Sequence, residues 1–256
     1  MSRNLCYTVL CLRVRPTGES NREAWFLSAE EGIFKATVFG GPKSKLRSQV
    51  SPFNQGKLWV YRDPVRDSRK VSDFDVQSWR PGLRELYERT MAADSLAETV
   101  LATHAGGGSW ETSLKLAGDT LDCLENSGEK TCQRVLLHFF WAWTGFLGVK
   151  PDLLHCASCA CEAPADGILW YNQKEGNLLC GNCRAEAAGN TPFNSGQTPD
   201  ITAGPGARRW LLAVENLEPK DSLRYSLDNV SFHQARALVL SILTESLGKR
   251  LSLWDY

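Results

Sequence analysis

The sequence predicts an α+β protein: a small N-terminal β-barrel, followed by a helical domain with an inserted four-cysteine hairpin. Three observations predict this organisation. Strand-like runs fill the first 80 residues, helical periodicity begins after Pro81-Gly82, and two Cys-x-x-Cys pairs lie within residues 156–183. The 256 residues suffice for one large domain or for two or three smaller units.

Residues 1–80 are expected to form the barrel, because they contain five short runs of strand character separated by turn signals. These runs are Cys6–Arg15, Ala24–Leu27, Ile33–Phe39, Lys57–Arg62 and Val71–Val76. The first run alternates Leu10, Leu12 and Val14 with Cys11, Arg13 and Arg15. Five strands are typical of the OB-fold, a barrel that binds oligonucleotides, and an SH3-like barrel would fit the count almost as well.

Residues 81–152 are expected to form the first part of an all-helical domain. The apolar face of its first helix would consist of Leu83, Leu86, Tyr87 and Met91. Ser109 is a good N-cap for a second helix. The segment Cys132–Leu147 is apolar nearly all round, so it should be a central, buried helix.

Residues 191–256 are expected to contain a polar surface loop and the returning helices of the same domain. The loop, Thr191–Gly206, is rich in Pro, Gly, Ser and Thr, and helical spacing resumes at Ala207–Leu217. Ser231 and Gln234 have the spacing of a capping box at the start of the last helix, and Gly248 should end it.

The most specific signal lies in residues 153–190, where Cys156, Cys159, Cys180 and Cys183 form two Cys-x-x-Cys pairs. This spacing is typical of a zinc site with four thiolate ligands, in which a hairpin brings two tight turns together. Two strand-like runs, Ile168–Asn172 and Asn177–Leu179, would supply the hairpin. Four cysteines leave no open position, so we expect one structural Zn²⁺ in a zinc ribbon.

Two alternative roles remain open for these cysteines. The pairs could be redox motifs or thiols that cluster without function. The identity of the ligands is also open, because Cys161 and His155 flank the motif and either could replace one of the four.

Charge is distributed unevenly, although Lys plus Arg and Asp plus Glu both total 29. Between Ile33 and Lys70, nine cations face two anions, whereas nine acids face two cations between Glu85 and Glu129. Such a local excess of positive charge favours an anionic partner for the barrel. The candidate nucleic-acid-binding residues are Arg13, Arg15, Lys35, Lys43, Lys45 and Arg47.

Aromatic side chains on the same strands could stack nucleic-acid bases without sequence preference. They are Phe34, Phe39, Trp59 and Tyr61. The alternative is that these rings fill the barrel core and the charges form a solvated face.

Several classes of protein are disfavoured. The N-terminus lacks a secretory signal, and the most apolar stretch, Val135–Val149, is too short for a membrane span. Nine cysteines, five of them crowded together, indicate a reducing compartment, so we expect a cytoplasmic protein. The four histidines have no catalytic neighbours, and His138 should be a core residue, so no enzyme is expected.

The order of these parts resembles the RecO family of bacterial recombination-mediator proteins, and the resemblance runs nearly end to end. Four segments carry it: LRVRPTGESNR (Leu12–Arg22), GGPKSKLRSQVSPF (Gly40–Phe53), LLHFFWAWTGFLGVKPDLLHCASC (Leu136–Cys159) and LTESLGKRLS (Leu243–Ser252).

The resemblance implies binding of single- and double-stranded DNA, strand annealing, and a nucleoid-associated role in DNA repair and homologous recombination. It also implies RecR and the C-terminal tail of the single-strand-binding protein as partners, and indirect action on the RecA recombinase. By position, Lys43, Lys45 and Arg47 correspond to the family's DNA-contacting tip, and the four cysteines to its zinc ligands. Since some members lack the cysteines, the metal would support the structure.

Two other functions remain open from the residues themselves. The chain could be a protein-interaction adaptor or a zinc-ribbon RNA binder without DNA annealing activity. It could also be a thiol-disulfide enzyme, which predicts reactive thiols and no metal.

Overall fold

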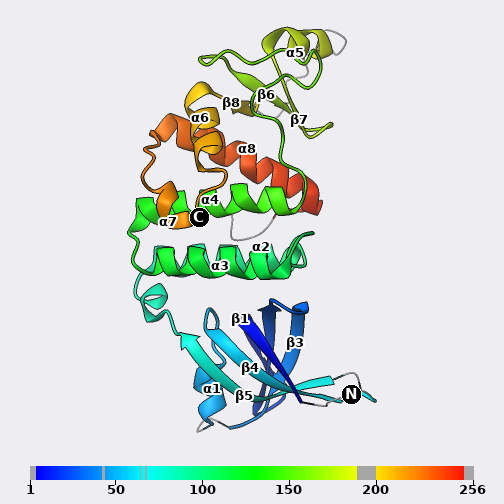
Figure 1. Ribbon diagram of the computed structural model, residues 1–256, viewed down its shortest axis with the longest axis vertical. Coiled ribbons are helices and arrows are strands. Elements are labelled where there is room, and N and C mark those ends of the chain that lie inside the picture. Colours follow the sequence, from blue (N-terminus) through cyan, green and yellow to red (C-terminus); the bar gives the residue numbers. More distant parts are fainter. Residues whose placement is uncertain (1–3, 42–43, 64, 67, 189–199, 251–256) are drawn as a thin grey trace. The chain divides into compact units, whose positions relative to one another are not determined.

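The computed structural model describes the chain except for residues 1–3, 42–43, 64, 67, 189–199 and 251–256 (Figure 1). The described residues form two compact units, with the division between Cys132 and Gln133. The first unit contains all the strands of the barrel and two long helices, and the second contains the cysteine hairpin and further helices.

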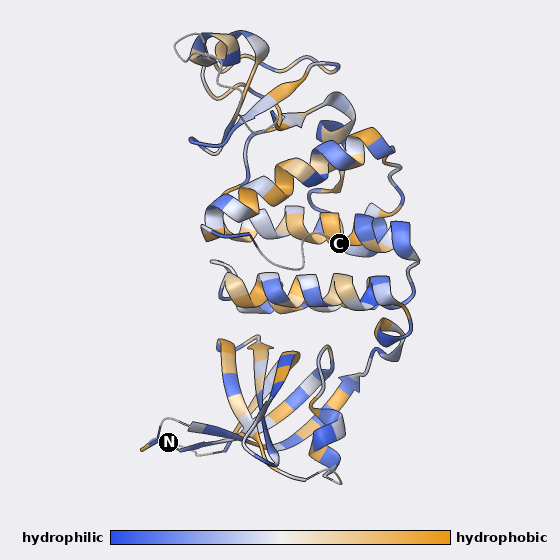
Figure 2. Cartoon of the chain, turned by 180° about the vertical axis from the view of Figure 1, so that it is seen from behind, coloured by the Kyte–Doolittle hydropathy of each residue, from blue (hydrophilic) through white to orange (hydrophobic). Residues whose placement is uncertain are grey.

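Five strands close into the N-terminal barrel in the order β1-β2-β3-β5-β4, which confirms the predicted fold class. Their bounds are β1 Asn4–Thr17, β2 Asn21–Ser28, β3 Gly32–Val38, β4 Gln55–Asp63 and β5 Ser68–Ser78. All neighbouring pairs are antiparallel except β3 and β5, which run parallel where the barrel closes. In Figure 2 the strands change between hydrophobic and hydrophilic along their length, as a barrel with one dry face requires.

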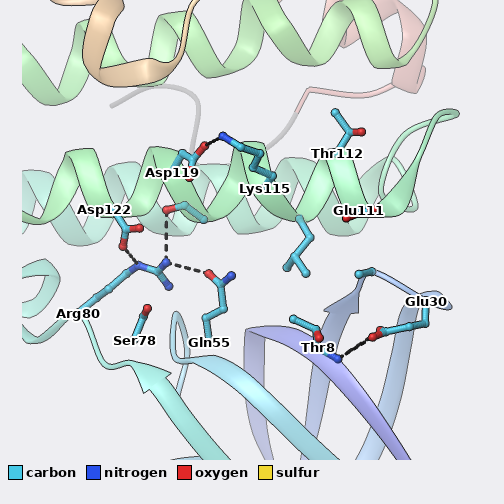
Figure 3. Close-up of a pocket in the computed structure, with 13 residues that line it drawn as sticks. Thr8, Glu30, Gln55, Ser78, Arg80, Glu111, Thr112, Lys115, Asp119 and Asp122 are labelled. Atoms are coloured by element: carbon cyan, nitrogen blue, oxygen red, sulfur yellow. Dashed lines mark hydrogen bonds and ion pairs between the residues drawn. The ribbon is translucent and has the colours of Figure 1, made fainter.

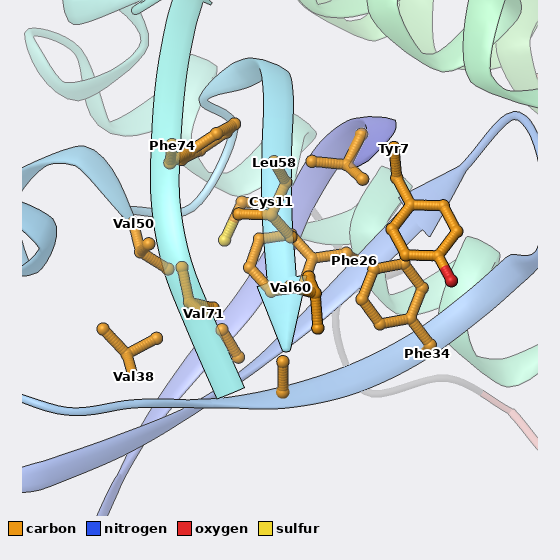
Figure 4. Close-up of a cluster of buried hydrophobic side chains, with 13 residues drawn as sticks. Tyr7, Cys11, Phe26, Phe34, Val38, Val50, Leu58, Val60, Val71 and Phe74 are labelled. Atoms are coloured by element: carbon orange, nitrogen blue, oxygen red, sulfur yellow. The ribbon is translucent and has the colours of Figure 1, made fainter. Parts of the chain in front are cut away.

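Aromatic rings and small aliphatic side chains fill the barrel interior (Figure 4). Phe26 lies between Phe34 and Phe74, with ring centroids 5.6 Å and 6.3 Å away, and Tyr7 packs on Phe34 at 5.1 Å. Cross-strand register places Ala24 opposite Ala36 on this inner side. Phe34 is therefore a core residue and cannot stack on a ligand.

The alternation along β1 is interrupted by a β-bulge between Cys11 and Arg13. Before the bulge, Tyr7, Val9 and Cys11 point into the barrel; after it, Val14 packs against the core. Leu10 and Leu12 therefore do not share the inner face with Val14, contrary to the simple alternation in the sequence. Leu10 pairs with Leu27 and is fully buried outside the barrel core, on a wall that helices α2 and α3 contact.

The segment between β3 and β4, which lies between two predicted strands, contains a short helix, α1 (Lys45–Gln49). Its inward side is anchored by apolar contacts, since Leu46 packs against the barrel core and Val50 belongs to it. Lys45 and Ser48 are exposed on its other side. The helix therefore gives part of the basic segment a defined backbone.

Two long helices follow a 3₁₀ turn, η1 (Pro81–Arg84): α2 (Tyr87–Ala102) and α3 (Trp110–Glu125). The apolar face predicted for the first helix is wrong. Leu86 precedes α2 and is 42% exposed, and Tyr87 is 69% exposed, while the buried face is built around Leu96 and Val100. The predicted N-cap is confirmed, because the Ser109 hydroxyl accepts a hydrogen bond from the Thr112 N–H at 3.4 Å.

A cleft of about 740 Å³ lies between the barrel and α3, and Arg80 is among the residues that line it (Figure 3). Arg80 is buried, and its backbone has a positive φ of 45°. Its guanidinium donates to the Asp122 carboxylate at 2.5 Å and to Gln55 Oε1 at 2.8 Å. It also donates to two buried carbonyls, those of Phe53 and Gly118. One side chain thus ties the start of β4 and the end of β5 to α3.

The second unit is built on most of α4 (Glu129–Phe146, from Gln133 onward) and on α6 (Pro205–Val214), α7 (Pro219–Ser222) and α8 (Asn229–Leu247). Trp141 and Trp143 of α4 are buried, as the sequence predicts for a central helix. The start of α8 differs from the prediction, because Asp228 is the N-cap and accepts from the Ser231 N–H at 2.9 Å. Gly248 ends the helix with a positive φ, as expected.

The hairpin strands are β6 (Leu169–Asn172) and β7 (Asn177–Leu179), nearly as predicted. A third strand, β8 (Thr202–Ala203), pairs with β6 and lies in the segment predicted to be only a loop. Within the described part of the chain, no helix is long and apolar enough to cross a membrane.

Candidate metal centre and nucleic-acid interface

The sulfur atoms of Cys156, Cys159, Cys180 and Cys183 all lie within 4.8 Å of one another. A tetrahedral site with zinc–sulfur distances of about 2.3 Å places its sulfurs ~3.8 Å apart. The Cys159 and Cys180 sulfurs are 3.9 Å apart, which matches this spacing. Among the described residues, this is the one group of His, Cys, Asp and Glu side chains close enough to hold a metal ion.

The first cysteine pair lies in a tight turn whose backbone folds back on itself. The Cys156 N–H donates to the Cys161 carbonyl and the Ala160 N–H donates to the Cys156 carbonyl, both at 2.9 Å. Ala160 has a positive φ of 57°, which a non-glycine residue adopts only when its surroundings hold it there. The turn therefore fixes the directions of the two thiols.

The second cysteine pair belongs to a helix start instead of a second such turn. Cys180 directly follows β7 and Cys183 lies in the first turn of α5 (Gly181–Ala188). The Cys180 N–H donates to the Cys156 sulfur at 3.2 Å, so the backbone of one pair supports the sulfur of the other. The predicted hairpin is present, but the second pair spans the end of β7 and the first turn of a helix.

The hydrogen bonds in the cluster favour the thiolate form of two of the four cysteines, Cys156 and Cys159, whereas the neighbouring sulfurs raise the pKa of Cys183. Burial raises the pKa of Cys156, but N–H donors from Cys159, Cys180 and Ser158 outweigh it and lower the pKa to about 6. The pKa of Cys159 is also lowered, chiefly because the Cys161 thiol donates to it. Since thiolates are the metal-binding form of cysteine, these donors suit Cys156 and Cys159 to a cation.

The two alternative ligands are placed differently. The Cys161 sulfur lies 3.0 Å from that of Cys159, at the edge of the cluster and outside the set of four. His155 is exposed, and its Nδ1 pairs with the Asp152 carboxylate at 2.9 Å. The geometry favours the four predicted cysteines as the metal-binding set.

A buried arginine supports the first cysteine turn from α6. Arg208 donates to the Leu153 carbonyl at 2.8 Å and to the Pro164 and Gly167 carbonyls at 3.0 Å each. These carbonyls lie on both sides of the turn, and burial lowers the pKa of the guanidinium. Sequence reasoning missed Arg208, because nothing in a helical segment distinguishes a buried arginine from an exposed one.

The nucleic-acid candidates on the barrel form an outward-facing row. Register pairs Arg13 of β1 with Trp25 of β2, and Trp25 with Lys35 of β3. All three point away from the core, since their strand neighbours Ala24 and Ala36 point inward. Trp25 is half-buried, so one indole ring lies between two cations on this face.

Neighbouring charges extend and partly neutralise this row. The Arg15 guanidinium lies 5.8 Å from the centre of the Trp25 ring. Lys35 pairs with Glu23 at 3.2 Å, an exposed contact worth little. The pKa of Asp94 is raised by burial and lowered in smaller part by Arg13, so Arg13 also has an acidic neighbour on α2.

The basic segment before β4 contains the candidates Lys43, Lys45 and Arg47, and a contact links it to β2. Lys45 is exposed on α1, and the Arg47 carbonyl accepts a hydrogen bond from Arg22. Lys43 lies outside the described residues, so its role stays a prediction.

The aromatic candidates divide into core and surface. Phe34 is buried, whereas Phe39 is 44% exposed and has the Lys70 amine 5.2 Å from its ring centre. Trp59 is 36% exposed and Tyr61 is half-buried. The sequence did not identify Trp25 as a candidate. Its position between two outward-facing cations depends on the register of β2 with β1 and β3, and the alternation within β2 does not determine that register.

Comparison with known proteins agrees with this architecture. Two family models match the chain: "Recombination protein O N terminal" over residues 1–76 and "Recombination protein O C terminal" over residues 84–199.

Curated relatives carry the name "DNA repair protein RecO". The protein from Desulfitobacterium hafniense is 26% identical over 255 residues, covering 94% of this chain and 88% of that protein. The protein from Desulforamulus reducens is 22% identical and covers 96% and 91%, respectively. A Synechococcus relative is 26% identical over 69% of this chain, but the match spans only 62% of that protein. With both domain models matched in order, the chain belongs to the RecO family.

Proposed function

We propose that this chain binds DNA through the outer face of β1, β2 and β3 and acts in DNA repair and recombination without covalent chemistry. The row of Arg13, Trp25 and Lys35 carries the proposal. Arginine and lysine neutralise phosphates, and an indole ring between them can stack on a base of a single strand. The choice of DNA is supported by family relatives named as DNA repair proteins.

Binding of this kind has a measurable electrostatic signature. Each phosphate that a cation neutralises releases a counterion. A plot of the logarithm of the association constant for single-stranded DNA against the logarithm of the salt concentration therefore has a slope of about −0.7 for each phosphate contact. Arg15 and Lys45 are exposed and would add phosphate contacts beside the row. Lys43 and Arg47, predicted from the sequence, belong to the same proposal.

The test is a salt titration of binding to a labelled single strand, followed by fluorescence anisotropy. The double variant Arg15→Glu, Lys35→Glu should bind more weakly and give a shallower salt slope. A matched control, Lys57→Glu, changes an exposed lysine on β4, which register places opposite Asp75. Binding that does not depend on salt, or an equal loss in the control, would contradict the proposal.

The finer activities are proposed from family membership. They are annealing of complementary strands, binding to double-stranded DNA, contacts with RecR and the tail of the single-strand-binding protein, and assistance to RecA. An annealing assay with the same three proteins tests the first activity. Purified partners added one at a time test the contacts, and a chain that binds DNA but does not anneal would limit the proposal to binding.

One structural Zn²⁺ is proposed at Cys156, Cys159, Cys180 and Cys183. Four cysteine sulfurs within 4.8 Å of one another are a donor set that structural zinc sites use. The four residues would hold the turn, the hairpin and the start of α5 together. Metal analysis of the purified chain tests this, with one zinc per chain expected; reactive thiols without metal would favour the thiol-disulfide alternative.

An adaptor function is favoured by one observation, the exposed Trp59 on β4. Its cross-strand neighbours are Cys6 and Asp73, so no cation lies directly opposite this ring, unlike Trp25. An exposed ring in such surroundings suits a protein partner better than a phosphate backbone. Retention of a protein partner with no retention of DNA or with preference for RNA would support the adaptor or RNA-binding alternative.

The domain division is proposed as 1–80 for the barrel, 81–152 and 191–256 for the helical domain, and 153–190 for the hairpin. The end of β5 at Ser78 and the start of η1 at Pro81 support the first boundary. The expected cytoplasmic, nucleoid-associated location remains a prediction that fluorescence imaging of a tagged chain would test.

A further inference from the structure

The cluster contains a fifth cysteine that the metal site does not need. Cys161 lies two residues after Cys159, is exposed, and is not one of the four mutually close sulfurs. Its sulfur is 3.0 Å from the Cys159 sulfur, about 1 Å more than the roughly 2.05 Å of a disulfide bond. A small movement of either side chain would therefore bring the two sulfurs to bonding distance.

We propose that Cys159 and Cys161 form a peroxide-sensitive pair, in which Cys161 captures an oxidised Cys159 as a disulfide and removes it from the metal-binding set. This inference rests on the proposed zinc site for its consequence, but the pairing itself depends only on the two thiols. Nothing in the family match or in the Cys-x-x-Cys motif assigns a role to Cys161.

Position supports Cys159 as the oxidised partner. Cys156 is buried, and its sulfur accepts the Cys180 N–H, whereas Cys159 is exposed at the outer side of the turn. Exposure lets a small peroxide reach it, and redox-sensitive cysteines are characteristically accessible and next to a second thiol.

The turn holds the two sulfurs near each other. Ala160, the residue between them, has a positive φ, and its N–H is bonded to the Cys156 carbonyl. The Cys161 carbonyl in turn accepts the Cys156 N–H. Because the backbone on both sides is fixed, Cys161 is held in place and meets Cys159 as an intramolecular neighbour.

The chemistry balances with a peroxide as oxidant. The Cys159 thiolate attacks one peroxide oxygen, so an S–O bond forms while the O–O bond breaks and hydroxide leaves. The Cys161 sulfur then attacks the Cys159 sulfur, forming the S–S bond as the S–O bond breaks. The departing hydroxide takes the Cys161 proton and leaves as water, and the peroxide has gained two electrons from the two thiols.

The expected consequence is a loosened hairpin. With Cys159 in a disulfide, three cysteines remain for the metal, and the metal no longer links the cysteine turn to the end of β7 through all four sulfurs. A dithiol reductant would reverse the change by thiol exchange.

The test treats the full-length chain with hydrogen peroxide and compares it with Cys161→Ser. Mass spectrometry of digested protein should find a Cys159–Cys161 disulfide, and a coloured chelator should report zinc release. Release should be on the order of tenfold slower in Cys161→Ser, because the neighbouring thiol is lost. Cys6→Ser, which removes an exposed thiol of the barrel, should release zinc at the unmodified rate.

The contrary outcomes are equally specific. A disulfide between two of the four metal-binding cysteines, or equal release in Cys161→Ser, overturns the pairing. Loss of zinc from untreated Cys161→Ser would make Cys161 a ligand and also overturn it. If the untreated chain holds no zinc but the Cys159–Cys161 disulfide still forms, the zinc proposal fails while the pairing stands.

Discussion

Arg80 and Asp122 form an ion pair of 2.5 Å that joins the end of β5 to α3. The Arg80 side chain is buried, whereas that of Asp122 is 56% exposed. The carboxylate therefore neutralises the guanidinium from the solvent side, and the other guanidinium donors bind groups inside the protein. Those donors satisfy the carbonyls of Phe53 and Gly118. The barrel and α3 therefore share one hydrogen-bond network and should unfold together.

Replacing Arg80 with leucine is expected to lower the free energy of unfolding by about 3 kcal/mol, because the buried Phe53 carbonyl loses its donor and Asp122 loses its charged partner. Urea denaturation followed by circular dichroism measures the change. The control is Arg84→Leu, which removes an exposed arginine that donates to the Pro52 carbonyl and should cost under about 1 kcal/mol. Equal effects of the two changes would show that the Arg80 network stabilises the fold no more than an exposed hydrogen bond does.

Trp25→Leu is expected to weaken binding to single-stranded DNA by about 1–3 kcal/mol, the usual contribution of one base stacked on an aromatic ring. Leucine keeps the half-buried position apolar, so the barrel should stay folded. Trp59→Leu removes the exposed ring on β4, away from the basic row, and should leave affinity unchanged. Anisotropy titrations at one fixed salt concentration compare the three proteins, and a larger loss from the Trp59 change would reassign the interface.

Arg208→Met is expected to weaken metal binding by about 10- to 100-fold, as loss of supporting contacts around a metal site commonly does. The change leaves the Leu153 and Gly167 carbonyls without their donor and removes one of two donors to the Pro164 carbonyl, so the cysteine turn loses its anchor on α6. Competition with a chelator of known affinity measures the dissociation constant of the metal for both proteins. Arg209→Met alters the exposed neighbour on the same helix and should have no effect.

Removal of metal by a chelator is expected to expose the hairpin before the barrel. The strands β6 and β7 are short, and a metal bound by the four cysteines would link the cysteine turn to the end of β7. Hydrogen exchange should rise first in residues 156–183, while exchange in the barrel core around Phe26 stays slow. Simultaneous loss of protection in both would contradict a local role for the metal.

Glu31→Gln is expected to destabilise the barrel at neutral pH and not in acid. Burial alone would raise the pKa of Glu31, but the Tyr7 hydroxyl and Arg69 donate to its carboxylate and bring the pKa below its usual value. A lowered pKa contributes stability above the ordinary carboxyl pKa of about 4.3, and this contribution is lost as the pH falls further. The carboxylate is partly exposed, so about 1 kcal/mol is expected at pH 7.

Thermal unfolding from pH 3 to pH 8 checks this. The two proteins should have similar stability at the acid end and separate as the pH rises. Glu19→Gln, an exposed change in the β1–β2 turn, should follow the unmodified chain throughout.

Patterns with a short range were well predicted from the sequence. The five strands and the hairpin were found because alternation and turn residues are local, and the Ser109 cap because one side chain determines it. The cysteine cluster was predicted because metal chemistry constrains spacing directly.

Features set by tertiary contacts were not predictable in the same way. The exposure of Leu86 and Tyr87 depends on where η1 ends, and the short helix before β4 depends on Leu46 reaching the barrel core. Arg80 and Arg208 are ordinary arginines in the sequence. Only the fold shows that each is buried against backbone carbonyls of distant segments.

The bulge between Cys11 and Arg13 determines which side chains of β1 face the solvent, where a ligand could contact them. Side chains alternate with a period of two, so one extra residue exchanges the inner and outer positions of everything after it. If the strand ran through Leu12 in strict alternation from Cys11, Arg13 and Arg15 would face the apolar interior. The positive charge of this wall thus depends on the spacing of residues as much as on composition, because one position outside the alternation turns two arginines toward the solvent.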